Sequence, residues 1–232
     1  MLQLQRQNEI MRLLEAHKEL TVKELCAMLF YSPATIRRDL SDLEQKGLLR
    51  RSFGGAVFVE NYLEQYPLEV RATKNIASKK RICAKAAQLI QPGDTVFIAA
   101  SSTTFFLPPL LKDIPELTVV TNSPHMNIKL SEHKIRNLCT GGEMLTGSIA
   151  LVGNEAERFI RGIRANKTFF SGRGLSKDGI ITDSSKMERD LKITMLEQSQ
   201  ESYYLVDESK IGLEFPWCIA KAADIDGIID DT

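Results

Sequence analysis

The chain has 232 residues, 43% of them hydrophobic, which is long enough for two small domains that each bury a core. Its 30 basic residues balance 30 acidic ones, so no overall field draws it to polyanions, and contact with nucleic acid must come from a local basic patch. We find neither a signal-peptide pattern nor an apolar run of about 18 residues, and therefore expect a cytoplasmic protein with no membrane partner.

The four cysteines are far apart in the sequence and match no zinc or disulfide spacing. We therefore expect buried thiols, no metal site and no cofactor. The three histidines are scattered, and we assign them no chemistry.

Three short helices are predicted in the first part of the chain. Apolar residues recur at helical spacing over residues 5–17 and again over residues 22–29. The second of these helices starts with a capping box, Thr21 followed three residues later by Glu24. The third starts at Ser32, a good N-cap that precedes a proline at the first helical position. The short gap before it is typical of a helix-turn-helix.

The third helix is predicted to bury one face and to leave Arg38, Ser41 and Asp42 on the opposite side. After it, Gly47 is placed to end the helix, and residues 50–58 have the pattern of a basic hairpin with a glycine turn. Such a hairpin beside the third helix would be a wing that touches phosphates or the minor groove. The spacing alone leaves open a simpler alternative, in which three helices and a hairpin pack together with no nucleic acid involved.

These residues resemble the signature of the DeoR family of bacterial transcription regulators. The resemblance rests on residues 35–40, Leu43-Glu44, Gly47, Arg51 and residues 54–56. It implies a winged helix-turn-helix that binds double-stranded operator DNA. The residues that we expect to contact DNA are Ser32, Thr35, Arg37, Arg38, Ser41, Arg50, Arg51, Gly54 and Gly55.

Some residues of the motif have other expected roles or depart from the family pattern. We expect Asp39 to pair with a nearby arginine and not to read a base. The chain has Tyr31 where family members often have valine, and Phe53 where they often have histidine before the paired glycines. Both departures leave the motif intact.

The helical periodicity weakens over residues 59–77, which we assign to a linker between a domain of residues 1–58 and a domain of residues 78–232. In the second domain, helix-length segments alternate with apolar, β-branched runs. This alternation predicts an α/β domain with a mostly parallel sheet. The expected strands are 95–98, 117–121, 168–170 and 203–206.

The loops after these strands form the candidate ligand site, because open α/β sheets bind ligands beyond the carboxyl ends of their strands. Hydroxyls before a short helix can bind a phosphate, and Lys210 can neutralise its charge. Asp207 or Glu208 can form hydrogen bonds with sugar hydroxyls. Each cluster taken alone is also explained as an N-cap or a turn. The candidate effector residues are Ser101, Ser102, Thr103, Thr104, Thr121, Asn122, Ser123, Gly141, Gly142, Arg173, Asp207 and Lys210.

In order along the chain, these clusters resemble the sugar-phosphate-sensing domain of DeoR regulators, whose fold is related to ribose-5-phosphate isomerase. Four features depart from it. Ala99 stands where a carboxylate is usual, and Asn166 stands where an aspartate usually precedes the strand at Thr168. Arg173 lies between two glycines, where a small residue is commoner. Family members continue past the stretch that ends at Asp230, so we expect a last strand or helix to be missing.

The resemblance implies a sequence-specific transcription regulator without catalytic residues, expected to be a repressor of a carbohydrate operon. Its expected effector is a phosphorylated sugar or a related metabolite, and its expected assembly is a homodimer or a higher homo-oligomer. Two alternatives stay open. One is an isomerase-like enzyme on sugar phosphates, with Asp207, Glu208 or Lys210 moving the proton. The other is a regulator whose C-terminal domain only dimerises.

Overall fold

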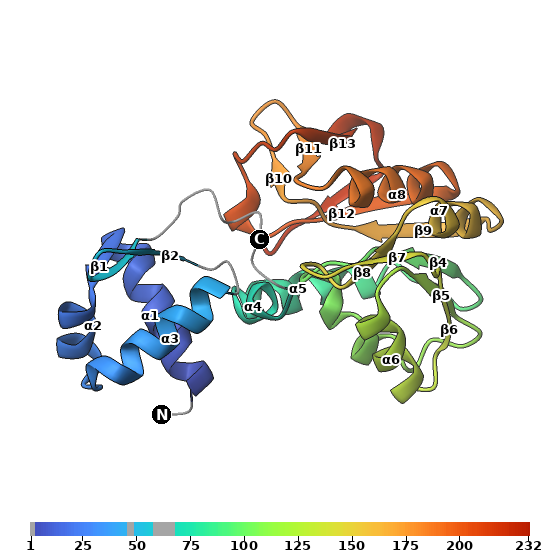
Figure 1. The fold of residues 1–232 in the computed structure, drawn as a ribbon. Helices are drawn as coiled ribbons and strands as arrows, with labels where there is room; N and C mark the ends of the chain where they lie inside the picture. Colours follow the sequence, from blue (N-terminus) through green and yellow to red (C-terminus); the bar gives the residue numbers. More distant parts are fainter. Residues whose placement is uncertain (1–2, 46–48, 58–67) are drawn as a thin grey trace. The chain divides into compact units, whose positions relative to one another are not determined.

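The computed structural model describes residues 3–45, 49–57 and 68–232, and it divides into two compact units, Met1–Pro67 and Leu68–Thr232 (Figure 1). The second unit begins with a short helix and the start of a longer one. Residues 68–77, which we expected in the linker, therefore belong to the second unit. The remainder of the expected linker, like Gly47, lies outside the described residues.

The first unit contains the three helices and the hairpin that were predicted, together with one further short strand that was not. Its elements in chain order are α1 (Gln3–His17), β1 (Glu19–Thr21), α2 (Val22–Leu29), α3 (Pro33–Gln45), β2 (Arg50–Ser52) and β3 (Gly55–Val57). The strands are ordered β1-β3-β2, so the hairpin β2–β3 is extended by the strand that precedes α2. The core is formed by fully buried side chains from all three helices: Ile10, Leu14, Leu25, Ile36 and Leu40.

The second unit is built on a six-stranded sheet ordered β14-β12-β9-β4-β5-β6, in which every neighbouring pair is parallel. This confirms the predicted α/β class. The strands are β4 (Thr95–Ile98), β5 (Thr118–Thr121), β6 (Arg136–Cys139), β9 (Ala165–Phe170), β12 (Ser199–Leu205) and β14 (Gly227–Ile229). The edge strands β6 and β14 were not predicted, because β6 carries the polar residues Arg136 and Asn137 and β14 is only three residues long.

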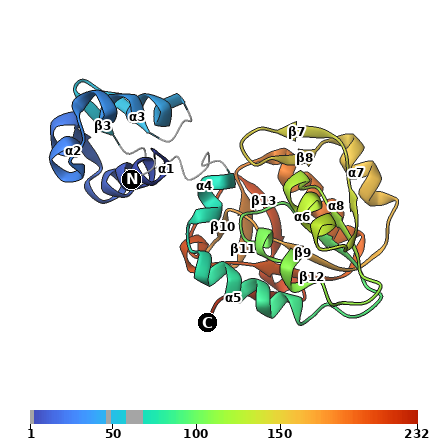
Figure 2. The same ribbon diagram turned by 90° about the horizontal axis from the view of Figure 1, so that it is seen from below.

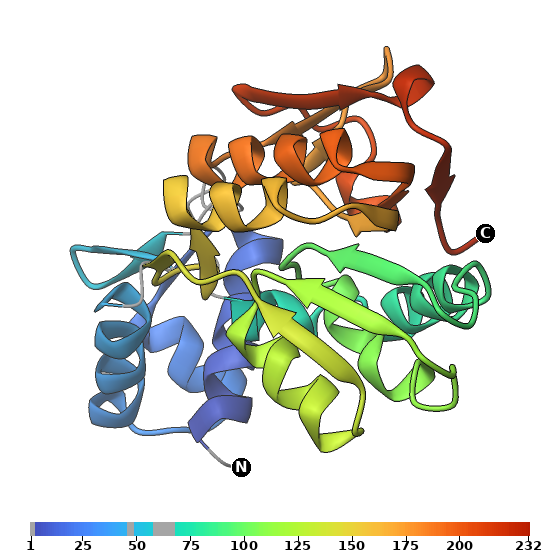
Figure 3. The ribbon, with the colours of Figure 1, turned by 90° about the vertical axis from the view of Figure 1, so that its right-hand side faces the viewer.

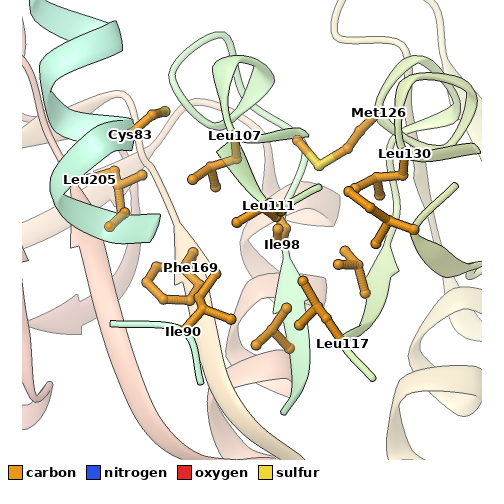
Figure 4. Close-up of a cluster of buried hydrophobic side chains, with 14 of the residues drawn as sticks. Cys83, Ile90, Ile98, Leu107, Leu111, Leu117, Met126, Leu130, Phe169 and Leu205 are labelled. Carbon is orange, nitrogen blue, oxygen red and sulfur yellow. The ribbon is translucent and has the colours of Figure 1, made fainter. Parts of the chain in front are cut away.

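Helices cover both faces of this sheet (Figures 2 and 3). One core lies between the sheet and α5 (Ile76–Ala87), η2 (Thr104–Phe106), η3 (Pro108–Leu110) and α6 (Pro124–Glu132), as Figure 4 shows. The other lies against α7 (Asn154–Arg161) and α8 (Lys186–Glu197). Within β4, Ile98 faces the first core and Phe97 the second, as the alternation of side chains along a strand requires.

Smaller elements complete the unit. An antiparallel sheet is ordered β10-β11-β13, and β7 pairs with β8. Their bounds and those of the remaining helices are α4 (Leu68–Thr73), β7 (Glu143–Leu145), β8 (Ala150–Val152), β10 (Gly174–Leu175), β11 (Ile180–Asp183), η4 (Glu208–Lys210), β13 (Trp217–Lys221) and η5 (Ala222–Asp224). None of the helices in the described ranges is both long enough and apolar enough to span a bilayer.

The expectation of four buried thiols is wrong for three of them. Cys83 is buried in the first core, Cys26 and Cys139 are half-buried, and Cys218 is exposed on β13. All four are free thiols. Cys218 directly precedes the buried Ile219 on β13, and neighbouring side chains on a strand point to opposite faces, so Cys218 is exposed.

Candidate DNA-reading surface and effector site

The helix α3 begins at a side-chain cap and presents two arginines to solvent. The hydroxyl of Ser32 accepts a hydrogen bond from the Thr35 backbone N–H at 3.3 Å and contacts the Thr35 hydroxyl at 2.9 Å. Ile36 is fully buried on the opposite face, whereas Arg37 and Arg38 are exposed. The exposed face of α3 therefore has the charge and the freedom that contact with DNA phosphates and base edges requires.

An ion pair fixes α3 against α1. Arg6 donates from two nitrogens to the carboxylate of Asp39, with Nη2 at 3.1 Å from Oδ1. The hydrogen bond to Asp39 raises the pKa of the guanidinium, which also lies 4.8 Å from the centre of the Tyr31 ring. The prediction that Asp39 pairs with an arginine is confirmed. Asp39 thus positions the reading helix.

The hairpin β2–β3 is attached to both neighbouring elements. The Arg51 backbone N–H donates to Glu44 on α3 at 2.9 Å, and the Val22 N–H donates to the carbonyl of Gly54 at 2.8 Å. Gly55 is buried against β1, where an added Cβ would lie 2.3 Å from the carbonyl oxygen of Leu20. Gly55, which we expected to contact DNA, is therefore required for packing.

The other predicted DNA-contacting residues are placed differently from Gly55. Arg50, Arg51 and Gly54 are exposed on the hairpin, and Ser32 is exposed at the start of α3. Thr35 and Ser41 on α3 are half-buried. The arginines of the hairpin and of α3 form the charged part of this surface.

In the second unit, the loop after β4 uses most of its hydroxyls internally. The Ser101 hydroxyl accepts hydrogen bonds from the backbone N–H groups of Thr103 at 3.2 Å and Thr104 at 2.9 Å. The Thr104 hydroxyl donates to the carbonyl of Ala99 at 2.8 Å. Ser102 is buried. This loop is held in a turn by its own side chains, and Thr103 is the residue that bonds outward.

The predicted cluster after β5 also serves the fold. Asn122 accepts from the Ala100 N–H at 2.7 Å and donates to the carbonyl of Leu151 at 3.0 Å. The hydroxyl of Ser123 caps α6, and that of Thr121 accepts from the Ser123 N–H at 3.1 Å. These contacts account for all three side chains as turn and cap residues.

The glycine pair after β6 follows the same pattern. Gly141 and Gly142 have φ values of 69° and 105°, which L residues rarely adopt. An added Cβ on Gly142 would lie 2.5 Å from the carbonyl oxygen of Val152. Both glycines are explained by the turn and by its close approach to β8.

Polar groups from three adjacent strands meet at the carboxyl end of the sheet. Lys210 follows β12, Ser171 follows β9 and Thr103 follows β4, and these strands are neighbours. The Lys210 ammonium donates to Ser171 Oγ at 2.7 Å and to Thr103 Oγ1 at 3.4 Å. This is the position at which parallel α/β sheets bind ligands.

Asp207 and Lys79 extend this group of residues toward α4 and α5. Asp207 is 1% exposed and accepts from the side-chain amide of Asn75 at 3.1 Å. Lys79 is 3% exposed and donates to the backbone carbonyl of Arg71 at 2.6 Å. We call Thr103, Ser171, Asp207, Lys210 and Lys79 the Lys210 cluster.

Positive charge is in excess in the Lys210 cluster. Burial lowers the pKa of Lys210 to about 7 against the attraction of Asp207, and the cations Lys79, Arg71 and Arg173 lower it further. Burial likewise lowers the pKa of Lys79 to about 8. Lys210 and Lys79 therefore share the buried carboxylate of Asp207 and also feel the charge of nearby arginines, and an added anion would relieve the repulsion among these cations.

The pKa of Asp207 is also lowered, but by its partners and against the effect of burial. Burial alone would raise it, but Lys210, the hydroxyl of Ser209, the amide of Asn75 and Lys79 together hold it below its ordinary value. Asp207 is thus an ionised carboxylate that anchors the cluster. A hollow of about 560 Å³ lies beside it, lined by the start of α5 and by η4, and includes Asn75 and Ser209.

Sequence reasoning missed part of this arrangement. Lys79, Ser171, Asn75 and Arg71 were not among the predicted site residues, although Lys79 offered a signal. It lies three residues before Ile82 on the face of α5 that packs against the sheet, where a charged side chain is unusual. No group of three histidine, cysteine, aspartate or glutamate side chains suited to a metal ion is found among the described residues.

Two family models match this chain, one over most of the first unit and one over most of the second. The model of the DeoR-like helix-turn-helix domain matches residues 6–62, and that of the DeoR C-terminal sensor domain matches residues 74–232. An uncharacterised helix-turn-helix regulator of Bacillus subtilis, YulB, is 34% identical over 100% of this chain and 90% of its own length.

Two further relatives carry functional names. The lactose phosphotransferase system repressor of Staphylococcus epidermidis is 32% identical over 97% of this chain and 91% of its own. The L-fucose operon activator of Haemophilus influenzae is 35% identical over 82% of this chain and 76% of its own.

Solved structures resemble the fold at low sequence identity. The eIF2B delta protein of Chaetomium thermophilum is 14% identical over 71% of this chain and 59% of its own, with a TM-score of 0.53. Ribose 5-phosphate isomerase A of Methanocaldococcus jannaschii is 12% identical over 60% of this chain and 55% of its own, with a TM-score of 0.45. The two family models and the relatives show that this chain belongs to the DeoR family of helix-turn-helix transcriptional regulators.

Proposed function

We propose that this regulator binds operator DNA through the exposed face of α3 and the hairpin β2–β3, and that a phosphorylated sugar or a related metabolite bound at the Lys210 cluster controls it. The observation that carries the effector part is the surplus of positive charge that Lys210 and Lys79 leave over the one carboxylate of the cluster, Asp207, beside the hydroxyls of Ser171 and Thr103. A phosphate monoester supplies two negative charges and three acceptor oxygens near neutral pH, which matches this surplus.

The remaining residues of the cluster suit the rest of such a ligand. Thr103 and Ser171 present hydroxyls beside Lys210, and Asp207 is an ionised acceptor for sugar hydroxyls. Ala99 stands where the family resemblance leads us to expect a carboxylate, so Asp207 is the carboxylate assigned to the sugar in this proposal. Arg173 supplies further positive charge near Lys210.

We propose repression of a carbohydrate operon as the output, by a homodimer or a higher homo-oligomer. One relative is named a repressor of a lactose system and another an activator of a fucose operon, so both carry sugar-linked names. A two-fold pair of readers doubles the length of DNA that is recognised. Because operator DNA and phosphorylated sugars share the cytoplasm, we place the protein there.

The same cluster gives little support to the alternative of a sugar-phosphate isomerase. A catalytic base works best with a pKa near the working pH. The pKa of Asp207 is instead held below its ordinary value by four partners, and its side chain is 1% exposed. Glu208 is exposed on η4. Lys210, with a pKa of about 7, is the one of the three candidates whose pKa suits proton transfer, and it would have to act without Asp207 as a second proton-transfer group. We propose that the cluster binds its ligand without converting it, and incubation with ribose 5-phosphate or fructose phosphates should give no turnover.

The DNA part is tested by Arg38→Ala. We expect operator affinity to fall by roughly tenfold or more at fixed salt, because a guanidinium that contacts a base or phosphate is lost. Arg12→Ala is the matched control, since Arg12 is also exposed in the first unit but pairs with Glu9 on α1. Equal operator affinity of Arg38→Ala and the wild type in a gel-shift assay would contradict the proposed reading surface.

The effector part is tested by thermal-shift screening of phosphorylated sugars at millimolar concentration, with the unphosphorylated sugars alongside. A ligand that binds only the folded state raises the midpoint of unfolding. We expect stabilisation by a phosphorylated member for the wild type and for Lys112→Met, an exposed lysine control, but not for Lys210→Gln. Stabilisation by none of them would favour a C-terminal domain that only dimerises.

A further inference from the structure

Phe53 at the tip of the hairpin β2–β3 has an exposed fraction of 110%, the highest of the large hydrophobic side chains that the structure describes. Its ring is therefore not packed against the first unit. A single exposed apolar side chain on a protein surface needs no special explanation. Phe53 differs in two respects: its backbone is held rigidly, and it lies on a basic hairpin that is bonded to α3.

The tip of the hairpin is fixed to the body of the domain. The carbonyl of Gly54 accepts from the N–H of Val22 at the start of α2, at 2.8 Å. Gly55 pairs with Thr21 on β1 and approaches Leu20 so closely that an added Cβ would lie 2.3 Å from its carbonyl oxygen. The ring of Phe53 is thus presented outward at a fixed place, and little conformational entropy of the backbone is left to lose on binding.

The hairpin that carries Phe53 is also basic and is joined to the reading helix. Arg50 and Arg51 are both exposed on β2, and the Arg51 N–H is bonded to Glu44 of α3 at 2.9 Å. An apolar ring that follows two exposed arginines, on a rigid support attached to the helix of Arg38, suits a surface that combines phosphates with apolar base and sugar edges. The minor groove of DNA is such a surface.

We propose that Phe53 is an additional DNA-contacting residue, whose ring enters the minor groove beside the segment read by α3 and packs against a base step as an apolar wedge. This rests on the proposed operator binding. A phenyl ring offers no hydrogen-bond donor to a base, so it reads the deformability of the step and not its donor and acceptor pattern. Flexible pyrimidine–purine steps are therefore favoured at this position of the operator.

The proposal is tested with full-length protein and an operator selected from random DNA. We expect Phe53→Ala to lower the affinity roughly tenfold and to remove the preference for a pyrimidine–purine step at one flanking position. The dependence of affinity on salt should stay unchanged, because no phosphate contact is lost, whereas Arg51→Ala should reduce the salt slope by about one ion. With 2-aminopurine at the flanking step, its fluorescence should rise on binding of the wild type and not of Phe53→Ala.

Phe30→Gly is the control variant, since Phe30 is 90% exposed in the same unit but lies in the turn before α3. An equal loss of operator affinity in both variants would overturn the proposal, because it would mean that removing any exposed ring from the first unit weakens binding. Unchanged affinity and base preference of Phe53→Ala would also overturn it. A third result would also overturn it: Phe53→Ala binds DNA as tightly as the wild type once both are compared in the same oligomeric state. The ring would then belong to an interface between protein copies.

Failure of the proposed function would look different. In that case the wild type itself would select no DNA sequence, whereas failure of the Phe53 proposal alone would leave a wild type and a Phe53→Ala variant that bind the operator equally well.

Discussion

Arg6 and Asp39 join the first helix of the chain to the reading helix through an ion pair whose carboxylate is 1% exposed. Asp39 follows Arg38 directly, so the residue that anchors α3 is adjacent to the residue proposed to contact DNA. The Arg6 side chain is 13% exposed. Because both partners are largely removed from water, losing one of them leaves a poorly solvated charge on the other.

Arg6→Met is therefore expected to destabilise the first unit by about 3 kcal/mol, since it strands the Asp39 carboxylate in the protein interior. Urea unfolding followed by circular dichroism measures this change. Arg12→Met on the same helix removes an exposed guanidinium that pairs with Glu9, and should have a much smaller effect on stability, because water screens such a pair. Equal effects of the two variants would show that the Arg6–Asp39 pair has no special role.

Phe30 adopts a left-handed backbone conformation, with φ of 58° and ψ of 39°, at the end of α2. Glycine populates this conformation freely, whereas a residue with a Cβ pays about 1 kcal/mol. Because the ring is 90% exposed, little packing is lost when it is removed. We expect Phe30→Gly to raise the stability of the first unit by up to about 1 kcal/mol, partly offset by the greater freedom of glycine in the unfolded chain. A lower midpoint of thermal unfolding would contradict this.

Gly55→Ala tests the close packing of the hairpin on β1. An added methyl group would collide with the Leu20 carbonyl oxygen, and both partners are backbone atoms that cannot rotate away. We expect a lower midpoint of unfolding and weaker operator binding together. Gly93→Ala is the comparison, because an added Cβ there meets open space and only the positive φ of 81° is unfavourable. Normal stability of Gly55→Ala would mean that β1 and β3 separate easily.

The ligand affinity of the Lys210 cluster should depend on pH near neutrality. The pKa of Lys210 is about 7 and that of Lys79 about 8, so both ammonium groups lose their protons as the pH rises from 7 to 9. A phosphate monoester gains its second charge near pH 6. Affinity for a phosphorylated sugar should therefore be highest between about pH 6 and 7 and fall toward pH 9, with proton uptake on binding that calorimetry in buffers of different ionisation enthalpy detects. An affinity that stays constant from pH 6 to 9 in the wild type would contradict this expectation.

Without ligand, the stability of the second unit should change in the opposite direction. Above pH 7 the folded protein has lost the Lys210 proton that the unfolded chain keeps to about pH 10. The unfolded state then binds more protons, so the contribution of Lys210 to the free energy of unfolding rises with pH. The free energy of unfolding of the wild type, measured relative to that of Lys210→Gln in urea titrations, should rise from pH 7 to 9. A constant difference would mean that Lys210 keeps an ordinary pKa.

The local features of this protein were predictable from the sequence. The capping box of Thr21 and Glu24 and the start of α3 at Ser32 depend on residues three apart, and both are confirmed. The parallel sheet followed from the spacing of apolar runs. The helix α4 was missed because six residues are too few to show a helical period.

The site was only partly predictable, for a physical reason. Asn75 and Asp207, which are 132 positions apart, meet only after the sheet has formed. Lys79 joins the same group from α5, and its charge on a buried face was the available clue. Conversely, Asn122 and Ser123 have the composition of a ligand loop, but their hydrogen bonds belong to the fold. Polar residues after a strand look the same in sequence whether they cap a helix or bind a ligand.

The central claim is that a phosphorylated ligand at the Lys210 cluster changes the affinity of the reader for DNA. The most direct measurement is the operator dissociation constant of the wild type and of Lys210→Gln, at fixed salt, with and without the sugar phosphate that stabilises the wild type. We predict equal affinities without ligand, and a shift with ligand in the wild type alone. A ligand-induced shift of the same size in both proteins, or in neither, would contradict the account.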